Sequence, residues 1–162
     1  MKWIRWKTSL KNTATWCIKH HVKYNQSGSS AGMIRKKTNC AGYVCEALYR
    51  INVMPKGSNF WCGKTLHANS KAQKAFKKYF YVAHPKRTPK HANLKKGDIC
   101  GFQWGSARSN KCHTMVYAGM SKHGYPLWYT YGANTAFSTN ARRKKSYESK
   151  KIYVRIRFKN MD

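Results

Sequence analysis

Hydrophobic residues in the first half of the chain recur at the spacing of an α-helix. Residues 10–23 carry one apolar stripe, although their Thr content is high, and a helix remains the simplest interpretation. That stripe consists of Leu10, Ala14, Cys17 and Ile18. After a Gly-, Ser- and Asn-rich segment at residues 24–38, which is typical of a loop, a stronger pattern begins at Asn39. It comprises Ala41, Val44, Ala47, Leu48 and Ile51, and predicts the clearest helix of the chain.

The hydrophobic pattern changes from helical spacing to alternation in the second half of the chain. Residues 54–65 are predicted to be a loop, and residues 68–80, "ANSKAQKAFKKYF", a further amphipathic helix. From residue 97 onward, apolar and polar residues alternate in four runs that predict strands. These are "GDICGFQW", "CHTMVYAGM", "PLWYTYG" and "KIYVRIRF". Helices followed by antiparallel strands indicate an α+β fold.

The length of 162 residues is typical of one domain. We therefore predict a single domain over residues 1–162, with an N-terminal helical segment at residues 1–23 and an exposed basic loop at residues 140–151. A sheet of about four to six strands is expected, because that is the usual size.

Charge is the most unusual feature of the composition. The chain has 33 Lys and Arg residues against 4 acids, which gives a net charge of +29. Most of these cations have no acid to pair with, so they repel one another unless a polyanion or salt screens them. The expected partner is a polyanion, and nucleic acid, anionic lipid and an anionic wall polymer all fit this charge.

The shortage of acids excludes several kinds of chemistry. The only carboxylate side chains are Glu46, Asp98, Glu148 and Asp162. Glycoside hydrolysis by two carboxylates requires an acid and a base on either side of the bond, and calcium or magnesium sites require clustered oxygen ligands. The candidate nucleophiles and bases are therefore Cys, Ser and His.

Six cysteines raise the question of disulfides. They are Cys17, Cys40, Cys45, Cys62, Cys100 and Cys112. The first 21 residues lack the apolar stretch of a signal peptide or a membrane helix, so synthesis in a reducing cytosol with mostly free thiols is expected. If the protein acts outside a cell, it is then released by another route.

Cys40 lies at the first turn of the clearest predicted helix. Unpaired N–H groups and the helix dipole favour a thiolate there, and Arg35, Lys36 and Lys37 add to this effect. A papain-like peptidase needs a thiolate at a helix start and a histidine on a facing strand. His113 opens a predicted strand and can supply that histidine. Each residue also has a simpler interpretation, as a buried helical cysteine and as a structural histidine.

Four short motifs in the same order resemble a known family. They are "TNCAGYVCEAL", "LKKGDI", "HTMVYAG" and "WYTYGAN". Together they are similar to the NlpC/p-sixty superfamily of papain-like cysteine peptidases and the related CHAP amidases, especially the versions in phage lysins and tail proteins. The resemblance covers about residues 20–158 and implies a papain-like fold, with helices packed on an antiparallel sheet.

The resemblance implies a role for each matching residue. Cys40 would be the nucleophile, His113 the general base and later acid, and Tyr24 a donor to the oxyanion together with the Cys40 N–H. Tyr24 is further from Cys40 in sequence than the family pattern expects. Thr130 occupies the position of the residue that orients the histidine, and Asn134 follows on the same face. We favour Asn134, because an amide oxygen is the better acceptor for a ring N–H.

The implied activity is cleavage of an amide bond in the peptide part of peptidoglycan, as an endopeptidase or an N-acetylmuramoyl-L-alanine amidase. Trp61, Trp104 and Trp128 are candidates for lining the substrate groove. No metal or organic cofactor is implied, and the cysteines lack the close pairs of a structural zinc site. The expected partners are peptidoglycan and anionic wall polymers. The expected state is a monomer or a virion component that is made in the cytoplasm and acts at the bacterial cell wall.

A binding protein is the main competing interpretation. Cations interleaved with tryptophans can neutralise phosphates and stack on bases, as in proteins that bind single-stranded nucleic acid. The basic residues are, however, spread through every segment of the chain. The alternative is therefore a nucleic-acid-binding or structural virion protein with the same fold and no hydrolase activity.

Overall fold

The structure is a computed structural model that describes residues 1–26, 30–61, 64–67, 70–104 and 112–161, without the side chains of residues 60–73. Its elements are α1 (Trp3–Lys19), β1 (Lys23–Tyr24), β2 (Lys37–Thr38), α2 (Cys40–Arg50), β3 (Asn59–Trp61), β4 (Lys64–His67), α3 (Ser70–Tyr79), β5 (Phe80–Ala83), η1 (Pro89–His91), β6 (Ile99–Gln103), β7 (Cys112–Met120), β8 (Pro126–Tyr129), β9 (Arg142–Arg143), η2 (Lys145–Tyr147) and β10 (Ile152–Phe158). The fold is mixed α+β, as predicted.

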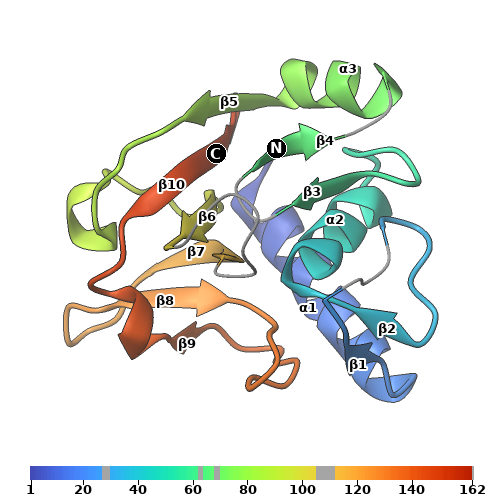
Figure 1. Cartoon of the computed structure of the whole chain (residues 1–162), viewed down its shortest axis with the longest axis horizontal. Coiled ribbons are helices and arrows are strands. Elements are labelled where there is room, and N and C mark those ends of the chain that lie inside the picture. The colour runs from blue at the N-terminus through green and yellow to red at the C-terminus, as the bar shows by residue number, and fades with distance from the viewer. Residues whose placement is uncertain (27–29, 62–63, 68–69, 105–111, 162) are drawn as a thin grey trace.

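A sheet of six antiparallel strands forms the centre of the molecule, in the order β5-β10-β6-β7-β8-β9 (Figure 1). Its central strands β10, β6 and β7 carry the β-branched and aromatic residues that favour a pleated, buried surface. Two small pairs lie outside this sheet. They are the parallel pair β1-β2 and the antiparallel pair β3-β4.

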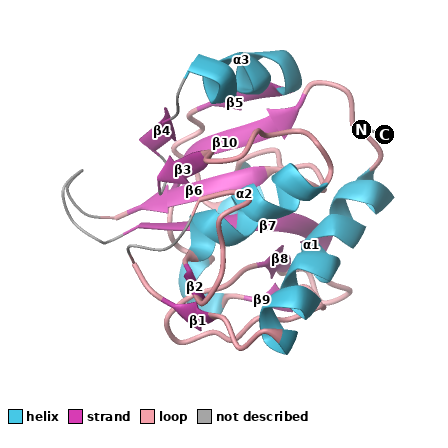
Figure 2. Ribbon diagram, turned by 90° about the vertical axis from the view of Figure 1, so that its right-hand side faces the viewer, coloured by secondary structure: helices cyan, strands magenta, loops and turns pink. Residues whose placement is uncertain are grey.

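Helices α1 and α2 pack against one another on the same side of the sheet, and α2 contacts β7 (Figure 2). Their apolar stripes bury Trp6, Leu10, Val44 and Leu48 completely. These side chains form the larger hydrophobic cluster of the protein, which we call the helix-side core. Burial of these stripes drives the two helices onto the sheet, because removing apolar surface from water is favourable by about 25 cal/mol per Å².

The opposite side of the sheet holds a smaller cluster, which we call the second core. Its members are Ala92, Cys100, Phe102, Met115, Tyr117, Trp128 and Ile152, with Leu94 and Tyr147 packed against them. Alternation along the strands produces this division, since Met115 and Tyr117 point to one face of β7 and Val116 to the other. No α-helix covers the second core among the described residues.

The predicted elements differ from the observed ones in several places. Helix α1 begins at Trp3 and ends at Lys19, whereas the apolar stripe predicted residues 10–23. The predicted helix 68–80 stops at Tyr79 because the chain continues directly into strand β5. Strands β3 and β4 begin in the region predicted as a loop. Residues 140–151 contain β9 and η2, so this segment is not simply an exposed loop.

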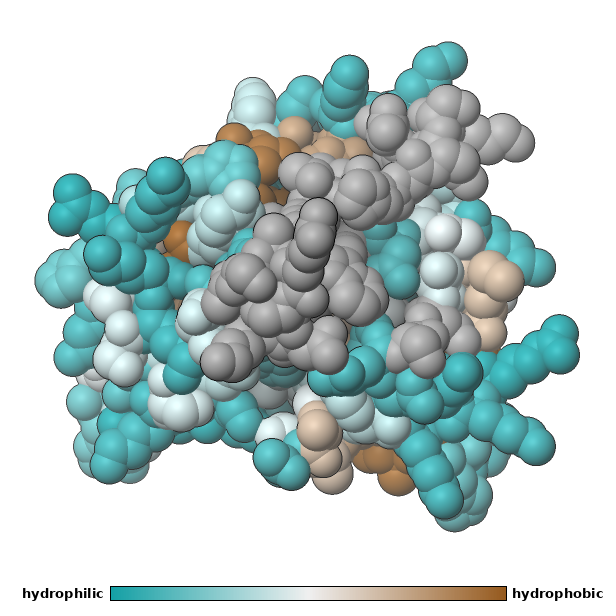
Figure 3. All heavy atoms as spheres, in the orientation of Figure 1, coloured by the Kyte–Doolittle hydropathy of each residue, from teal (hydrophilic) through white to brown (hydrophobic). Residues whose placement is uncertain are grey.

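The described part of the face in Figure 3 is mostly hydrophilic, with small hydrophobic areas. The two ends of the chain lie side by side in Figure 2, and the Met1 amino group donates a hydrogen bond to the Asn160 carbonyl. In the parts of the chain that the structure describes, no helix is both long and apolar enough to cross a bilayer.

Candidate active site

Cys40 is the first residue of α2, at a helix start that is well capped. The Asn39 side chain accepts a hydrogen bond from the Gly42 N–H at 2.8 Å, and its own amide donates to the Gln26 carbonyl at 2.9 Å. An asparagine in this position satisfies one of the unpaired N–H groups of the first turn. The cap uses the N–H of Gly42 and not that of Cys40. Only 3% of Cys40 is exposed.

His113 is the second residue of β7, and its ring lies at the end of the sheet. Its Nε2 is 2.7 Å from the Thr130 hydroxyl, which immediately follows β8. The other ring nitrogen, Nδ1, has no hydrogen-bond partner among the described residues. A side chain that holds one nitrogen of an imidazole fixes the ring and leaves the other nitrogen for chemistry.

Two further residues confine the His113 ring. A Cβ at position 132 would lie 3.3 Å from His113 Cε1, so Gly132 allows the chain to pass close to the ring. The Tyr147 ring lies 5.2 Å from the His113 ring between centroids, with the planes tilted by 38°. Only 8% of His113 is exposed. The ring is therefore held between the segment that follows β8 and η2.

Tyr24 reaches the start of α2 through the parallel pair β1-β2. In this pair Tyr24 stands opposite Thr38, two residues before Cys40. The Tyr24 ring also packs edge-on against Tyr131, at 5.6 Å between centroids. The strand pairing thus brings Tyr24 near the start of α2 in space, although Tyr24 and Cys40 are far apart in the sequence.

A cavity of about 580 Å³ lies beside these residues. Its walls come from the end of α1, from Tyr24 and from residues 131–137. Gly132 belongs to this wall and also contacts the His113 ring, so the cavity and the histidine share one boundary. This cavity is therefore a candidate for the space that a substrate enters.

The hydrogen-bond partner of His113 is Thr130 and not Asn134, which our sequence interpretation favoured. Asn134 is exposed and lines the cavity instead. The difference arises because the chain leaves the ladder after Tyr129 and turns at Gly132, where it makes an isolated bridge with Thr135. Alternation from a continuing strand therefore does not extend to Asn134.

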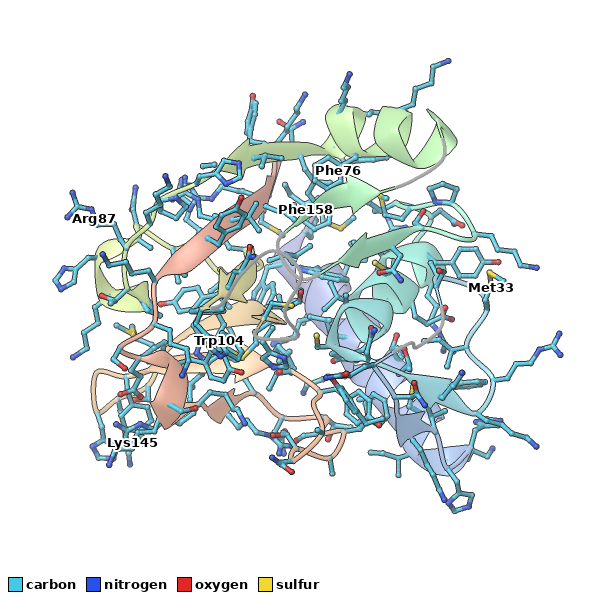
Figure 4. The ribbon with its side chains drawn as sticks, viewed as in Figure 1. Met33, Phe76, Arg87, Trp104, Lys145 and Phe158 are labelled. Carbon is cyan, nitrogen blue, oxygen red and sulfur yellow. The ribbon has the colours of Figure 1, made fainter. Side chains whose placement is uncertain are left out.

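The three tryptophans predicted to line a groove have different environments. Trp128 is completely buried in the second core against Phe102 and Tyr117, so it lines no groove, and that prediction is wrong. Trp104 is 43% exposed and packs edge-on against Tyr147 at 5.7 Å (Figure 4). The side chain of Trp61 lies outside the described residues.

Tyr147 and Lys150 are site residues that the sequence did not reveal. Both belong to the segment that we predicted to be an exposed basic loop, and no motif distinguishes them from its other residues. The Lys150 Nζ lies 5.0 Å from the Tyr147 ring centre and 5.2 Å from that of Trp104. A cation held over two rings is stabilised by their quadrupoles. It brings positive charge close to His113 on the side away from α2.

The other described cysteines differ from Cys40 in position. Burial raises the pKa of the Cys17 thiol to about 12, and burial also raises the pKa of Cys100 well above its ordinary value. Both thiols are therefore protonated and unreactive at neutral pH. None of the five described cysteines forms a disulfide. Within the described residues, no group of three or more His, Cys, Asp or Glu side chains converges as a metal site would require.

Comparisons with protein-family models, with curated proteins and with solved structures found no match for this chain.

Proposed function

We propose that this protein is a cysteine hydrolase that cleaves an amide bond in the peptide part of peptidoglycan, as an endopeptidase or an N-acetylmuramoyl-L-alanine amidase. The motifs around Cys40 and His113 suggest this activity through their resemblance to the NlpC/p-sixty and CHAP enzymes. A papain-like arrangement of the helix and the sheet belongs to the same proposal. The site of action would be the bacterial cell wall, after release or as part of a virion.

The observation that carries the proposal is the way His113 is held. Its Nε2 is hydrogen-bonded to a side chain on the segment that follows the neighbouring strand, at 2.7 Å, whereas Nδ1 has no partner among the described residues. Helix α2, which begins with Cys40, packs against β7, the strand whose second residue is this histidine. This combination matches what a cysteine nucleophile needs from its base.

The proposed reaction has two stages. His113 takes the proton of Cys40, and the thiolate attacks the carbonyl carbon of the substrate amide. The oxyanion that forms accepts hydrogen bonds from the Cys40 N–H and the Tyr24 hydroxyl. His113 then donates its proton to the leaving amine, and a thioester remains on Cys40. Water, deprotonated by His113, hydrolyses this thioester and regenerates the thiol.

Cys40 and His113 belong to opposite faces of the sheet, which limits where the two side chains would meet. His113 stands opposite Phe102 of the second core, whereas α2 packs on the other face. Because His113 is at the start of β7, its ring can meet Cys40 only around the end of the sheet. The cavity bounded by Tyr24 and Gly132 would admit the substrate there.

One observation favours a second candidate, a binding protein without hydrolase activity. Cys40 and His113 are 3% and 8% exposed, and a threonine hydroxyl holds an imidazole less firmly than an amide or a carboxylate. The second candidate keeps the basic surface and the affinity for anionic polymers, but not the reaction.

Digestion of purified peptidoglycan separates the two candidates. We expect the wild type to release peptide fragments, identified by mass spectrometry, and Cys40→Ala to release none while keeping the same circular dichroism spectrum. Cys112→Ser is the matched control, because Cys112 is partly exposed and neighbours His113. Fragments from Cys40→Ala, or none from the wild type, would rule out the proposed reaction.

Thiol labelling offers an independent test. Below about pH 8, iodoacetamide should modify an activated Cys40 faster than an ordinary thiol, as read by mass spectrometry of each cysteine. Cys17 and Cys100 serve as internal controls, since burial keeps both protonated. If Cys40 is labelled only after unfolding, the second candidate is favoured.

A further inference from the structure

A second cavity lies away from Cys40 and His113, where the two ends of the chain meet. It measures about 600 Å³ and shares no residue with the cavity beside the candidate active site. Its walls come from the start of α1, the loop before β6, strand β5 and the end of β10. The lining residues are Trp3, Tyr81, Lys95, Lys96, Gly97, Asp98, Arg157, Phe158, Lys159 and Met161.

Gly97 forms the base of this cavity. Its φ of +95° is a conformation that favours glycine, and a Cβ there would lie 2.6 Å from the end of Met161 and 3.4 Å from the Trp3 ring. The Gly97 carbonyl accepts a hydrogen bond from Trp6 Nε1 at 3.2 Å. The side chains of Met161, Trp6 and Trp3 therefore pack closely against the Gly97 backbone, and this part of the cavity wall is fixed.

The cavity carries a net positive charge, because its one acidic lining residue is paired with an arginine. Asp98 is 1% exposed, and Arg157 donates to both of its oxygens at 2.8 and 2.7 Å. The Lys95 N–H also donates to Asp98, at 2.8 Å. This hydrogen bonding raises the pKa of Arg157, so the guanidinium stays charged. The carboxylate is thus neutralised, and the charges of Lys95, Lys96 and Lys159 are left uncompensated by any acid among the described lining residues.

Two of the lysines and one tyrosine are placed by their contacts. The Lys96 stem lies along Gly119, where a Cβ would be 2.9 Å from Lys96 Cε. Lys159 donates to the Lys77 carbonyl at 2.6 Å, and its Nζ lies 5.3 Å from the Tyr81 ring centre. Tyr81 itself is 61% exposed. An exposed ring beside fixed cations is well placed to stack on a ligand.

We propose that this cavity binds a nucleoside phosphate, either free or as a unit of a single-stranded nucleic acid. The lysines would neutralise the phosphate, and the base would stack on Tyr81, which is more exposed than Trp3. The volume lies within the range of ordinary ligand pockets. A glycerol-phosphate wall polymer would satisfy the lysines but has no ring to cover the aromatic walls. This proposal is independent of the hydrolase activity.

Binding of short oligonucleotides tests the proposal. The probes are oligothymidylate, an abasic strand of the same length, thymidine monophosphate and poly(glycerol phosphate), each measured by titration at several salt concentrations. We expect oligothymidylate to bind about tenfold more tightly than the abasic strand, since stacking on one ring has roughly this effect. Tyr81→Leu should remove this preference and leave the binding of the abasic strand unchanged.

The double variant Lys95→Gln, Lys96→Gln should weaken binding of both strands and lower the slope of log K against log salt by about 1.4, as expected for two lost phosphate contacts. Lys19→Gln, Lys36→Gln is the matched control, because it removes the same charge from exposed positions outside the cavity. Titration with thymidine monophosphate shows whether a free nucleotide is enough for binding.

Three results would overturn the proposal. They are equal affinity for the strand with and without bases, an equal loss in the control variant, and tighter binding of poly(glycerol phosphate) than of oligothymidylate. The first two would reduce the binding to the overall charge of the protein, and the third would assign the cavity to a wall polymer.

Discussion

The two faces of the central sheet are covered in different ways. On one face, α1 and α2 bury a large apolar cluster that includes Trp6, Leu10 and Leu48 without any exposed part. On the other face, Trp128 and Phe102 are covered partly by Tyr147, which comes from the short helix η2. The first face is built from long regular elements, and the second from the short elements near the C-terminus.

This difference predicts that one face of the sheet serves mainly stability and the other the proposed reaction. The helix-side core buries apolar groups against one another, so substitutions there should act on folding. The second face carries His113 with its hydrogen-bonded Thr130, and its cover brings Tyr147 and Lys150 to the same place. Substitutions there should act on the proposed reaction more than on folding. Four predictions test this separation.

Leu48→Ala should have the largest effect, a loss of about 2–5 kcal/mol in the free energy of unfolding, because it opens a cavity in the helix-side core. Leu48 is completely buried. Denaturant unfolding followed by circular dichroism measures the loss. Ile4→Ala is the control, since Ile4 lies on α1 and is 58% exposed, and it should change stability by less than about 0.5 kcal/mol. An equally small loss of unfolding free energy in both variants would mean that the helices contribute little to the stability of the core.

Cys17 should make folding stability depend on pH. Burial raises its pKa from 9.0 to about 12, so above pH 9 the unfolded thiol ionises while the folded thiol stays protonated. Its contribution to stability is therefore complete below pH 9 and is lost as the pH rises towards 12, by at most about 1.4 kcal/mol per pH unit.

Cys17→Ala should show a shallower decline of stability above pH 9 than the wild type, in denaturant unfolding at several pH values. The difference in slope is the readout, because the other ionisable groups are the same in both proteins. Parallel curves would show that the Cys17 thiol ionises as easily in the folded state as in the unfolded chain.

Thr130→Val should lower kcat/KM for peptide release by about fivefold, since one hydrogen bond of about 1 kcal/mol no longer orients His113. The substitution keeps the shape of the side chain, so we expect only a small change in unfolding free energy. A variant with full activity would show that the 2.7 Å contact has no part in catalysis.

Thr114→Val should have the smallest effect and the opposite sign. Thr114 is buried on the helix side of β7, next to His113, and its hydroxyl has no hydrogen-bond partner among the described residues. Replacing an unpaired buried hydroxyl by a methyl group should stabilise the protein by up to about 1 kcal/mol and leave peptide release unchanged. The two Thr→Val variants thus compare the two faces of the sheet with the same chemical change.

Much of the fold was predictable because it depends on local patterns. Alternation identified β7 over "CHTMVYAGM" with its observed bounds, and helical spacing from Asn39 onward identified α2. Strand β5 was missed because apolar residues at the end of α3 continue the helical spacing. Its strand conformation comes from pairing with β10, which follows it by about seventy residues in sequence.

The sequence by itself determined the α+β class, the charge of +29 and the position of Cys40 at a helix start, because periodicity, composition and capping are properties of neighbouring residues. Only the tertiary structure decided that Thr130 holds His113, that Trp128 is core, and that Tyr147 and Lys150 belong to the site. These contacts join segments that sequence spacing does not relate, and the side on which the short elements close over the sheet is fixed by packing.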